Sequence, residues 1–218
     1  RDMSPDKSRK LKTDIAENLN IVNEYLYDCD DVITRIFYMG HTAKHKMALV
    51  YIDGMVAMDT VQNEVLKPLM LFARQFPLEY TVGEKFFEMV KEGLLTAGDI
   101  KETDNFGDVI LGILSGDTIL FMDKLEKTLV ISTRGWEKRG VEEPSTEAVI
   151  RGPRDGFTET YRTNVALVRR RLKDPNLKVK TIKLGRHTRT DVGIMYIKGV
   201  AKPSIVDEIL KRLNTIDI

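Results

Sequence analysis

The stretch MALVYIDG, residues 47–54, gives the clearest indication of the fold. Its first six residues are apolar, and the Asp-Gly pair that follows them is typical of a turn. Successive side chains of a strand point to opposite faces, so a strand that is apolar at every position needs cover on both faces. Residues 47–52 are therefore predicted to form a central strand of a sheet that is flanked by helices.

The segments around this strand divide into helical and strand patterns. Apolar residues at helical spacing predict four helices, and Pro68 should kink or divide the third. These helices cover residues 8–27 and 31–39, a segment from about 59, and about 86–94. Three short apolar runs separated by turn residues predict an antiparallel meander at 109–114, 118–122 and 128–132. Together these elements indicate an α/β subdomain.

A second unit follows a break in the pattern. From residue 134 to 156 the periodicity disappears and glycine and proline are frequent, which is typical of a domain boundary. A helix is then predicted at 157–172, strands at 178–184 and 191–197, and a last helix with Ser204 as its N-cap and Ile205, Ile209 and Leu213 facing inward. We predict an α/β protein of two subdomains with mixed sheets flanked by helices. The division is 1–133, a charged interdomain segment 134–156, and 157–218.

Composition narrows the class of protein. Of the 218 residues, 42% are hydrophobic and 31% charged, as in a folded domain with a solvated surface. The 34 basic and 33 acidic residues leave a formal net charge of +1, which does not favour nucleic acid or an anionic bilayer. No apolar run approaches the roughly 18 to 20 residues that span a bilayer. We expect a soluble segment that does not bind nucleic acid, with both ends cut from a longer protein.

Signatures of catalysis and of metal binding are weak. The single cysteine, Cys29, excludes an intrachain disulfide and is typical of a buried small residue in a reducing compartment. His41 and His45 have the spacing of two metal ligands on a helix, but they follow Gly40, where a loop is expected, and have no third ligand. No nucleophile elbow or phosphate-binding loop is present. The sequence predicts no enzyme, no cofactor and no metal site.

The first candidate functional residues lie in the charged segment and just after it. Arginine and glutamate alternate there, and a guanidinium pairs well with a carboxylate through two hydrogen bonds. We predict that Arg151 forms a partly buried ion pair with Glu147 or Glu143 that ties the two subdomains together. A solvated linker is the plainer interpretation. Arg154 and Glu159 are further candidates, and Arg151 or Arg154 would alternatively meet the carboxylate of a ligand between the subdomains.

Two more candidates, Arg162 and Arg169, are seven residues apart on the helix predicted at 157–172, so they share one face. We expect that face to point away from the apolar stripe of the helix, which makes both arginines candidates for contact with a partner protein. The alternative is pairing within the chain, with Glu159 or Asp155, at the small energies of surface ion pairs.

Several strings in the sequence occur together in one known family. The longest is Glu143-Pro144-x-x-Glu147-x-x-x-Arg151-Gly152-Pro153-x-x-Gly156-Phe157-x-Glu159, followed by Thr163-Asn164-x-x-Leu167-x-Arg169-x-Arg171. Shorter pieces are Asn18-Leu19, Asp31 with Arg35-x-Phe37, Tyr51-Ile52-Asp53-Gly54, Ser115-Gly116, Leu184-Gly185-x-x-Thr188-x-Thr190, and Tyr196. With this combination the chain resembles the GerA-type spore germination proteins, the A subunits of nutrient germinant receptors, from its first helix to its last.

The resemblance implies a function. Such A subunits have a large hydrophilic N-terminal region followed by membrane-spanning helices, which would lie beyond Ile218, and they act with B and C subunits in the spore inner membrane. The chain would then be the soluble N-terminal domain, on the spore core side, with a role in signal transduction and receptor assembly during nutrient-triggered germination. A homo-oligomer is a further option. The rival hypothesis is a module that binds a small-molecule germinant in a cleft between the two subdomains.

Overall fold

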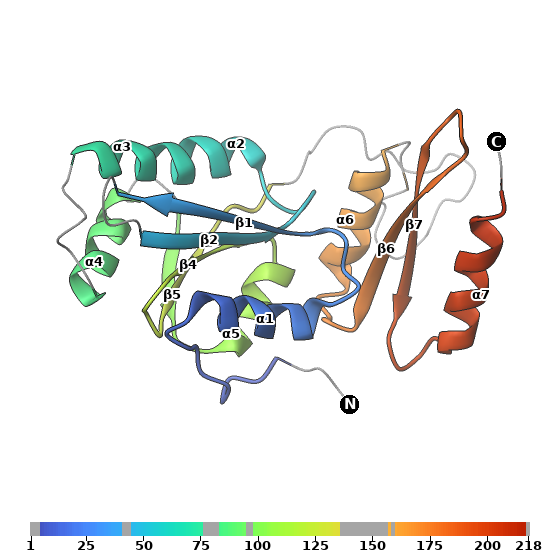
Figure 1. Cartoon of the computed structure of the whole chain (residues 1–218), viewed down its shortest axis with the longest axis horizontal. Coiled ribbons are helices and arrows are strands. Elements are labelled where there is room, and N and C mark those ends of the chain that lie inside the picture. Colours follow the sequence, from blue (N-terminus) through green and yellow to red (C-terminus); the bar gives the residue numbers. More distant parts are fainter. Residues whose placement is uncertain are drawn as a thin grey trace, which may run out of the picture.

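A five-stranded sheet forms the centre of the larger unit of the molecule (Figure 1). The computed structural model describes residues 5–40, 45–75, 83–94, 98–135, 157 and 160–216. The strands are β1 (Val32–Met39), β2 (His45–Ile52), β3 (Ile100–Thr103), β4 (Thr118–Met122) and β5 (Thr128–Ile131), in the spatial order β1-β2-β4-β5-β3. β2 has a strand on each side, which confirms the central strand predicted for residues 47–52.

Helices cover both faces of this sheet because β2 is apolar at successive positions. Ala48, Val50 and Ile52 belong to one buried cluster, together with residues of α1 (Ile15–Leu26) and α5 (Phe106–Leu114). Met47, Leu49 and Tyr51 belong to a second buried cluster. The helical residues of that cluster come from η1 (Val61–Leu66), α3 (Lys67–Gln75) and α4 (Gly83–Gly93). All six residues from 47 to 52 are at most 1% exposed, so neither face of β2 meets water.

The helix predicted from about residue 59 runs without a break from Met58 to Gln75, but it changes from π-helix to α-helix just before Pro68. α2 (Met58–Thr60) leads into η1, a stretch of π-helix, and α3 begins one residue before the proline. Proline has no backbone N–H, and its ring crowds the carbonyl four residues earlier. The regular α-helical hydrogen bonds therefore cannot continue through Pro68, and the wider π-helical turns come directly before it.

The smaller unit has the predicted order helix, strand, strand, helix. It consists of α6 (Tyr161–Arg171), β6 (Leu177–Leu184), β7 (Thr190–Ile197) and α7 (Pro203–Leu213). Figure 1 shows α7 at one end of the molecule, beyond β7. The α/β class is confirmed, although the strand pairs of both sheets are antiparallel where mixed sheets were expected. Most of segment 134–156 lies outside the described residues, so the proposed domain boundaries stay a prediction.

Two segments adopt a different secondary structure from the one predicted. Residues 32–39 form the edge strand β1 instead of a helix, and four of its first five residues are β-branched, which favours a strand. Residues 109–114 belong to α5 instead of a strand. The side chain of Asn105 caps this helix by accepting a hydrogen bond from the N–H of Asp108 (2.9 Å). The sequence does not predict β3, because two of its four residues are charged.

The last helix turns a different side inward from the one predicted. Ile205, Ile209 and Leu213 were expected to face the core, but Val206 is the buried residue of α7. Ile205 and Ile209 are exposed, and Leu213 is half-buried. The helix begins one residue before Ser204, so this serine lies inside the first turn and is not the N-cap.

Candidate functional site

The predicted site residues separate into two groups. The ion-pair candidates Glu143, Glu147, Arg151, Arg154 and Glu159 lie outside the described residues, so the pair expected in the charged segment stays a prediction. Arg162 and Arg169 lie on α6, and both contact the larger unit. Their contacts, with those of β6, define a junction between the two units. We use this name for residues 27–31, between α1 and β1, together with their partners on α6, β6 and β7.

The loop 27–31 is held against β6 by main-chain hydrogen bonds. The N–H of Asp30 donates to the carbonyl of Val179 (2.9 Å), and the N–H of Val179 donates to the carbonyl of Asp28 (2.9 Å). Cys29 and Val179 thereby form a parallel β-bridge. Asp28 has a φ of +55°, a left-handed conformation that aspartate adopts more readily than most residues. The loop is attached to the smaller sheet as a very short strand would be.

Arg169 makes the central side-chain contact of the junction. Its Nε and Nη2 donate to the two carboxylate oxygens of Asp31, each at 2.8 Å, and its Nη1 donates to the carbonyl of Leu177 at 2.9 Å. The Arg169 side chain is 0% exposed and that of Asp31 is 8% exposed. Burial opposes the charge, but the hydrogen bonds and charge of Asp31 outweigh it, so the pKa of Arg169 is raised. Arg169 is therefore a buried, paired residue, whereas an exposed position was expected.

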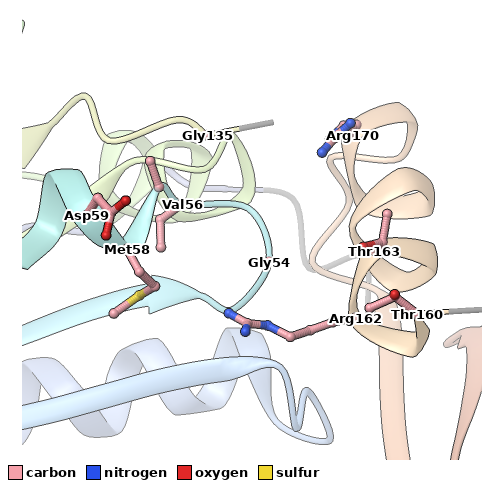
Figure 2. A pocket seen from close by; sticks show the side chains of 10 residues that line it. Gly54, Val56, Met58, Asp59, Gly135, Thr160, Arg162, Thr163 and Arg170 are labelled. Atoms are coloured by element: carbon pink, nitrogen blue, oxygen red, sulfur yellow. The ribbon is translucent and has the colours of Figure 1, made fainter. Parts of the chain in front are cut away.

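Arg162 lies seven residues earlier on α6 and contacts the same unit. It pairs with Asp53, the residue after β2, and Figure 2 shows its guanidinium group extending from α6 toward the turn at Gly54. The Arg162 side chain is 51% exposed. The two arginines thus share a face, as predicted, but that face points to the larger unit. A contact of Arg162 with a partner protein stays a prediction, and Glu159 and Asp155 lie outside the described residues.

Lys178 is a second buried cation at the junction. Its Nζ donates to the carbonyl of Tyr25 (3.1 Å) and lies 3.9 Å from the centre of the Tyr27 ring. Burial lowers the pKa of Lys178, and the charges of Lys198 and Arg169 lower it further. The contact attaches β6 to the end of α1, although the burial of this charge opposes folding.

Two further carboxylates of the loop contact the smaller sheet. Oδ2 of Asp30 accepts a hydrogen bond from the N–H of Thr181 (2.6 Å). Asp28 lies 3.2 Å from Nζ of Lys180 and accepts a hydrogen bond from the hydroxyl of Tyr196 (3.3 Å). Burial, together with the charge of Asp28, raises the pKa of Tyr196 to about 12. This hydroxyl therefore stays protonated, and able to donate, throughout the physiological pH range.

A cavity of about 400 Å³ lies beside the junction, between α6 and the turn that follows β2 (Figure 2). Its lining comes from both units: Gly54, Val56, Ala57, Met58, Asp59 and Gly135 on one side, and Thr160, Arg162, Thr163 and Arg170 on the other. Gly54 has a φ of +82°, and a Cβ at this position would lie 3.2 Å from the carbonyl oxygen of Arg162. The close approach of α6 to this turn therefore favours glycine.

Within the described residues, no group of three or more His, Cys, Asp or Glu side chains is placed to hold a metal ion. Burial raises the pKa of the Cys29 thiol. The roles of Asp31 and Lys178 were not predicted from the sequence. The available signal was the density of aspartates directly after α1, at positions 28, 30 and 31, which exceeds what one helix or strand terminus needs.

Comparisons with known proteins agree on one family. The model described as Bacillus/Clostridium GerA spore germination protein matches residues 20–218. The chain is 31% identical to spore germination protein KA of Bacillus subtilis (strain 168), over 95% of this chain and 37% of that protein. It is 32% identical to the uncharacterized membrane protein YfkQ of the same strain, over 100% of this chain and 41% of that protein.

A solved structure extends this similarity to the fold. The crystal structure of the N-terminal domain of the A subunit of the Bacillus megaterium spore germinant receptor GerK3 is similar, with a TM-score of 0.75 and 33% identity. The similarity covers 95% of this chain and 74% of that chain. The chain spans about two fifths of the length of the two curated relatives. In the part of the chain that the structure describes, no helix is long and apolar enough to cross a bilayer.

Proposed function

Because this chain belongs to the GerA spore germination protein family, we propose that it acts as the N-terminal domain of a germinant receptor A subunit. In this proposal it takes part in nutrient-triggered spore germination by transmitting a signal and by assembling with B and C subunits, and it catalyses no reaction. The complete receptor would lie in the spore inner membrane, with this domain on the core side. The similarity to an A-subunit domain of a spore germinant receptor supports the proposal.

The observation that carries the proposal is the unequal contact between the two units. At the junction, main-chain hydrogen bonds and the buried Arg169–Asp31 pair hold the smaller unit to the loop 27–31. Beside it, the cavity lies between the units, which also meet there through the half-exposed Arg162–Asp53 pair and the close approach of Gly54 to α6. A rotation about the junction would change the width of the cavity while the junction stayed bonded. Such a hinge can convert a local binding event into a change of orientation.

The test uses the full-length receptor in spores. The Arg162→Glu substitution places a carboxylate beside Asp53, and we expect slower germination at a normal receptor level, with little change in the melting of the domain. The double variant Asp53→Arg, Arg162→Glu should restore the pair and much of the rate. Lys183→Glu is a matched control, because it reverses one partner of an exposed pair with Asp191 within the smaller sheet.

Normal germination in the Arg162→Glu spores would contradict a role for this contact in transmission. Loss of the receptor together with an unfolded domain would assign Arg162 to folding instead. A slower response with a folded domain and a normal receptor level supports the proposal.

The cavity favours a second candidate function, the binding of a small-molecule germinant between the units. It is lined by both units, and Arg162, Arg170 and Asp59 supply charges of both signs. Arginine suits the carboxylate of a nutrient because it donates two parallel hydrogen bonds. Ligands are often bound at such boundaries between structural units.

Calorimetric titration of the chain with a nutrient mixture tests this alternative. Heat of binding that disappears in a Thr163→Trp variant, in which a large ring occupies the cavity, would support ligand binding by this domain. No heat with any nutrient would leave transmission and assembly as the function of the domain.

A further inference from the structure

The formal net charge of +1 conceals a separation of charge along the chain. Residues 157–218 contain 14 basic and 6 acidic residues, whereas residues 1–156 contain 20 basic and 27 acidic residues. Three of the basic residues of the smaller unit, Arg162, Arg169 and Lys180, pair with aspartates of the larger unit. A formal excess of five positive charges remains on the smaller unit. Such an asymmetry is typical of a protein that meets an anionic partner with one side.

The turn between β7 and α7 has an unusual composition for a surface turn. Its sequence is Lys198-Gly199-Val200-Ala201-Lys202. Val200 is 78% exposed, the highest value among the large apolar side chains in the described part of the chain. Turns are usually built from Gly, Pro, Asn, Asp and Ser, and valine has no conformational advantage there. An exposed valine between two lysines is therefore better explained by contact with another surface than by the needs of the turn.

The backbone holds this turn in one shape. The N–H groups of Val200 and Ala201 both donate to the carbonyl of Ile197, at 3.1 and 2.9 Å. Gly199 has a φ of +87°, and a Cβ there would meet nothing within 4 Å, so the turn is open to its surroundings. Figure 1 shows the turn at the lower right edge of the molecule, between β7 and α7. Val200 is thus presented at a fixed position on an accessible edge.

The residues beside the turn continue the same combination of apolar and basic groups. α7 begins directly after Lys202, and Ile205 in its first turn is 53% exposed. Lys202 is exposed and makes no ion pair with the residues that the structure describes. Nζ of Lys198 lies 4.6 Å from the centre of the Tyr27 ring, which holds this cation close to the base of the turn.

We propose that residues 198–205, which we call the tip, bind the surface of an anionic lipid bilayer. Val200 and Ile205 would enter the boundary between headgroups and acyl chains, while Lys198 and Lys202 would bind lipid phosphates. Lysine suits this position because its long side chain reaches the headgroups while its apolar neighbours are buried. The remaining positive charges of the smaller unit would attract the bilayer from a distance, and the acidic larger unit would face away from it.

A bilayer fits the tip better than other anionic partners. A nucleic acid or a free phosphate would contact the lysines but would leave Val200 and Ile205 in water. A bilayer offers phosphates and apolar chains to the same small surface. The proposal goes beyond the transmission of a signal, because it assigns a lipid contact to this domain itself. It is also independent of ligand binding, since no residue of the tip lines the cavity between the units.

Sedimentation of the chain with lipid vesicles tests the proposal. We expect binding to vesicles of phosphatidylglycerol and phosphatidylcholine at about 0.05 M salt, and release at about 0.5 M salt, which screens the charges. Lys202→Gln should weaken binding about fivefold, because a cation close to the anionic surface is lost. Lys211→Gln is the matched control: it removes an exposed lysine near the other end of α7 and should weaken binding less than about twofold.

Substitution of the valine tests the apolar part of the contact. Val200→Ser should weaken vesicle binding about tenfold and leave the circular dichroism spectrum unchanged, because its side chain is exposed in the free chain. Leu71→Ser, at an exposed leucine of α3, should bind like the original chain. Val200→Trp should bind more tightly and shift its emission to shorter wavelengths on binding, since tryptophan favours the bilayer interface. The original chain, with Trp136 alone, gives the baseline.

Three outcomes would overturn the proposal. The first is a chain that does not sediment with the anionic vesicles at low salt. The second is binding that Val200→Ser and Lys202→Gln weaken no more than their controls do, which would mean attraction by diffuse charge without a tip. The third is binding to duplex DNA, in the absence of vesicle binding, that Lys202→Gln weakens, which would assign the basic surface to nucleic acid.

Discussion

The two ends of α6 contact the larger unit in different ways. Near its C-terminal end, Arg169 and Asp31 are removed from water and held by three hydrogen bonds of the guanidinium group. Near its N-terminal end, Arg162 reaches Asp53 from a half-exposed position at the edge of a cavity. A buried pair that loses one partner is costly, whereas an exposed pair contributes little. The difference predicts that α6 is held more strongly near its C-terminal end than near its N-terminal end.

The largest effect on the free energy of unfolding should come from breaking the buried pair near the C-terminal end of α6. Arg169→Ala leaves the carboxylate of Asp31 buried without its cation, and we expect a loss of about 3 to 5 kcal/mol in the free energy of unfolding. Urea denaturation measures this loss. The double variant Asp31→Leu, Arg169→Met removes both charges and should be less destabilised than Arg169→Ala. A loss below about 1 kcal/mol for Arg169→Ala would place this pair in the same class as the exposed one.

A smaller effect is expected where α6 approaches the turn after β2. Gly54→Ala adds a Cβ in a left-handed conformation, 3.2 Å from the carbonyl oxygen of Arg162, and should cost about 1 to 3 kcal/mol. Gly199→Ala is the matched control, because Gly199 has a φ of +87° and its Cβ would meet nothing within 4 Å. The excess loss in Gly54→Ala measures the contact with α6. Equal losses would show that α6 yields freely at this end.

The pH dependence of stability tests the buried cation Lys178. Between its lowered pKa and the ordinary value of 10.5, the unfolded chain binds more protons than the folded chain, so stability rises with pH in this window. The original chain should therefore gain stability relative to Lys178→Met as the pH rises toward 10. At pH 7 the variant should be neutral or more stable by about 1 kcal/mol, because a buried charge has been removed. Lys183→Met, at an exposed lysine of the same strand, should show no such trend.

The smallest effect on stability should come from a substitution near the N-terminal end of α6. Arg162→Ala should change the free energy of unfolding by about 0 to 1 kcal/mol, since the pair is half-exposed. Amide exchange separates stability from motion: we expect faster exchange in the first turn of α6 and unchanged protection of Asp30 and Val179 at the junction. Faster exchange at both ends would mean that the two contacts open together, which contradicts the hinge.

The sequence predicted those parts of the fold in which local pattern and burial agree. The run at 47–52 predicted a central strand because it is apolar at every position, and all of its side chains are indeed buried. The same kind of run at 109–114 misled, because a helix buried on nearly all sides has no polar face to reveal its period. The residues Ile205 and Ile209 of α7 were predicted to face the core but are exposed, because periodicity identifies an apolar face without showing what covers it.

The candidate site was less predictable than the fold. The face shared by Arg162 and Arg169 followed from their spacing, but their partners Asp53 and Asp31 lie more than a hundred residues away in the sequence. Pairing over such distances depends on the tertiary arrangement of α6 against the loop 27–31. No local pattern in the sequence encodes that arrangement, so the burial of Arg169 could not be foreseen.

The separation between Asp31 and Arg169 also has a consequence for synthesis on the ribosome. The two residues are 138 positions apart, so at about 5 to 20 residues per second Arg169 is made roughly 7 to 28 s after Asp31. During that time the carboxylate keeps its water and the loop 27–31 has no β6 to pair with. The last strand of the larger sheet, β5, ends at Ile131, so all strands of that sheet are synthesised before Arg169 and β6. Closure of the junction has to wait until these later residues have been made.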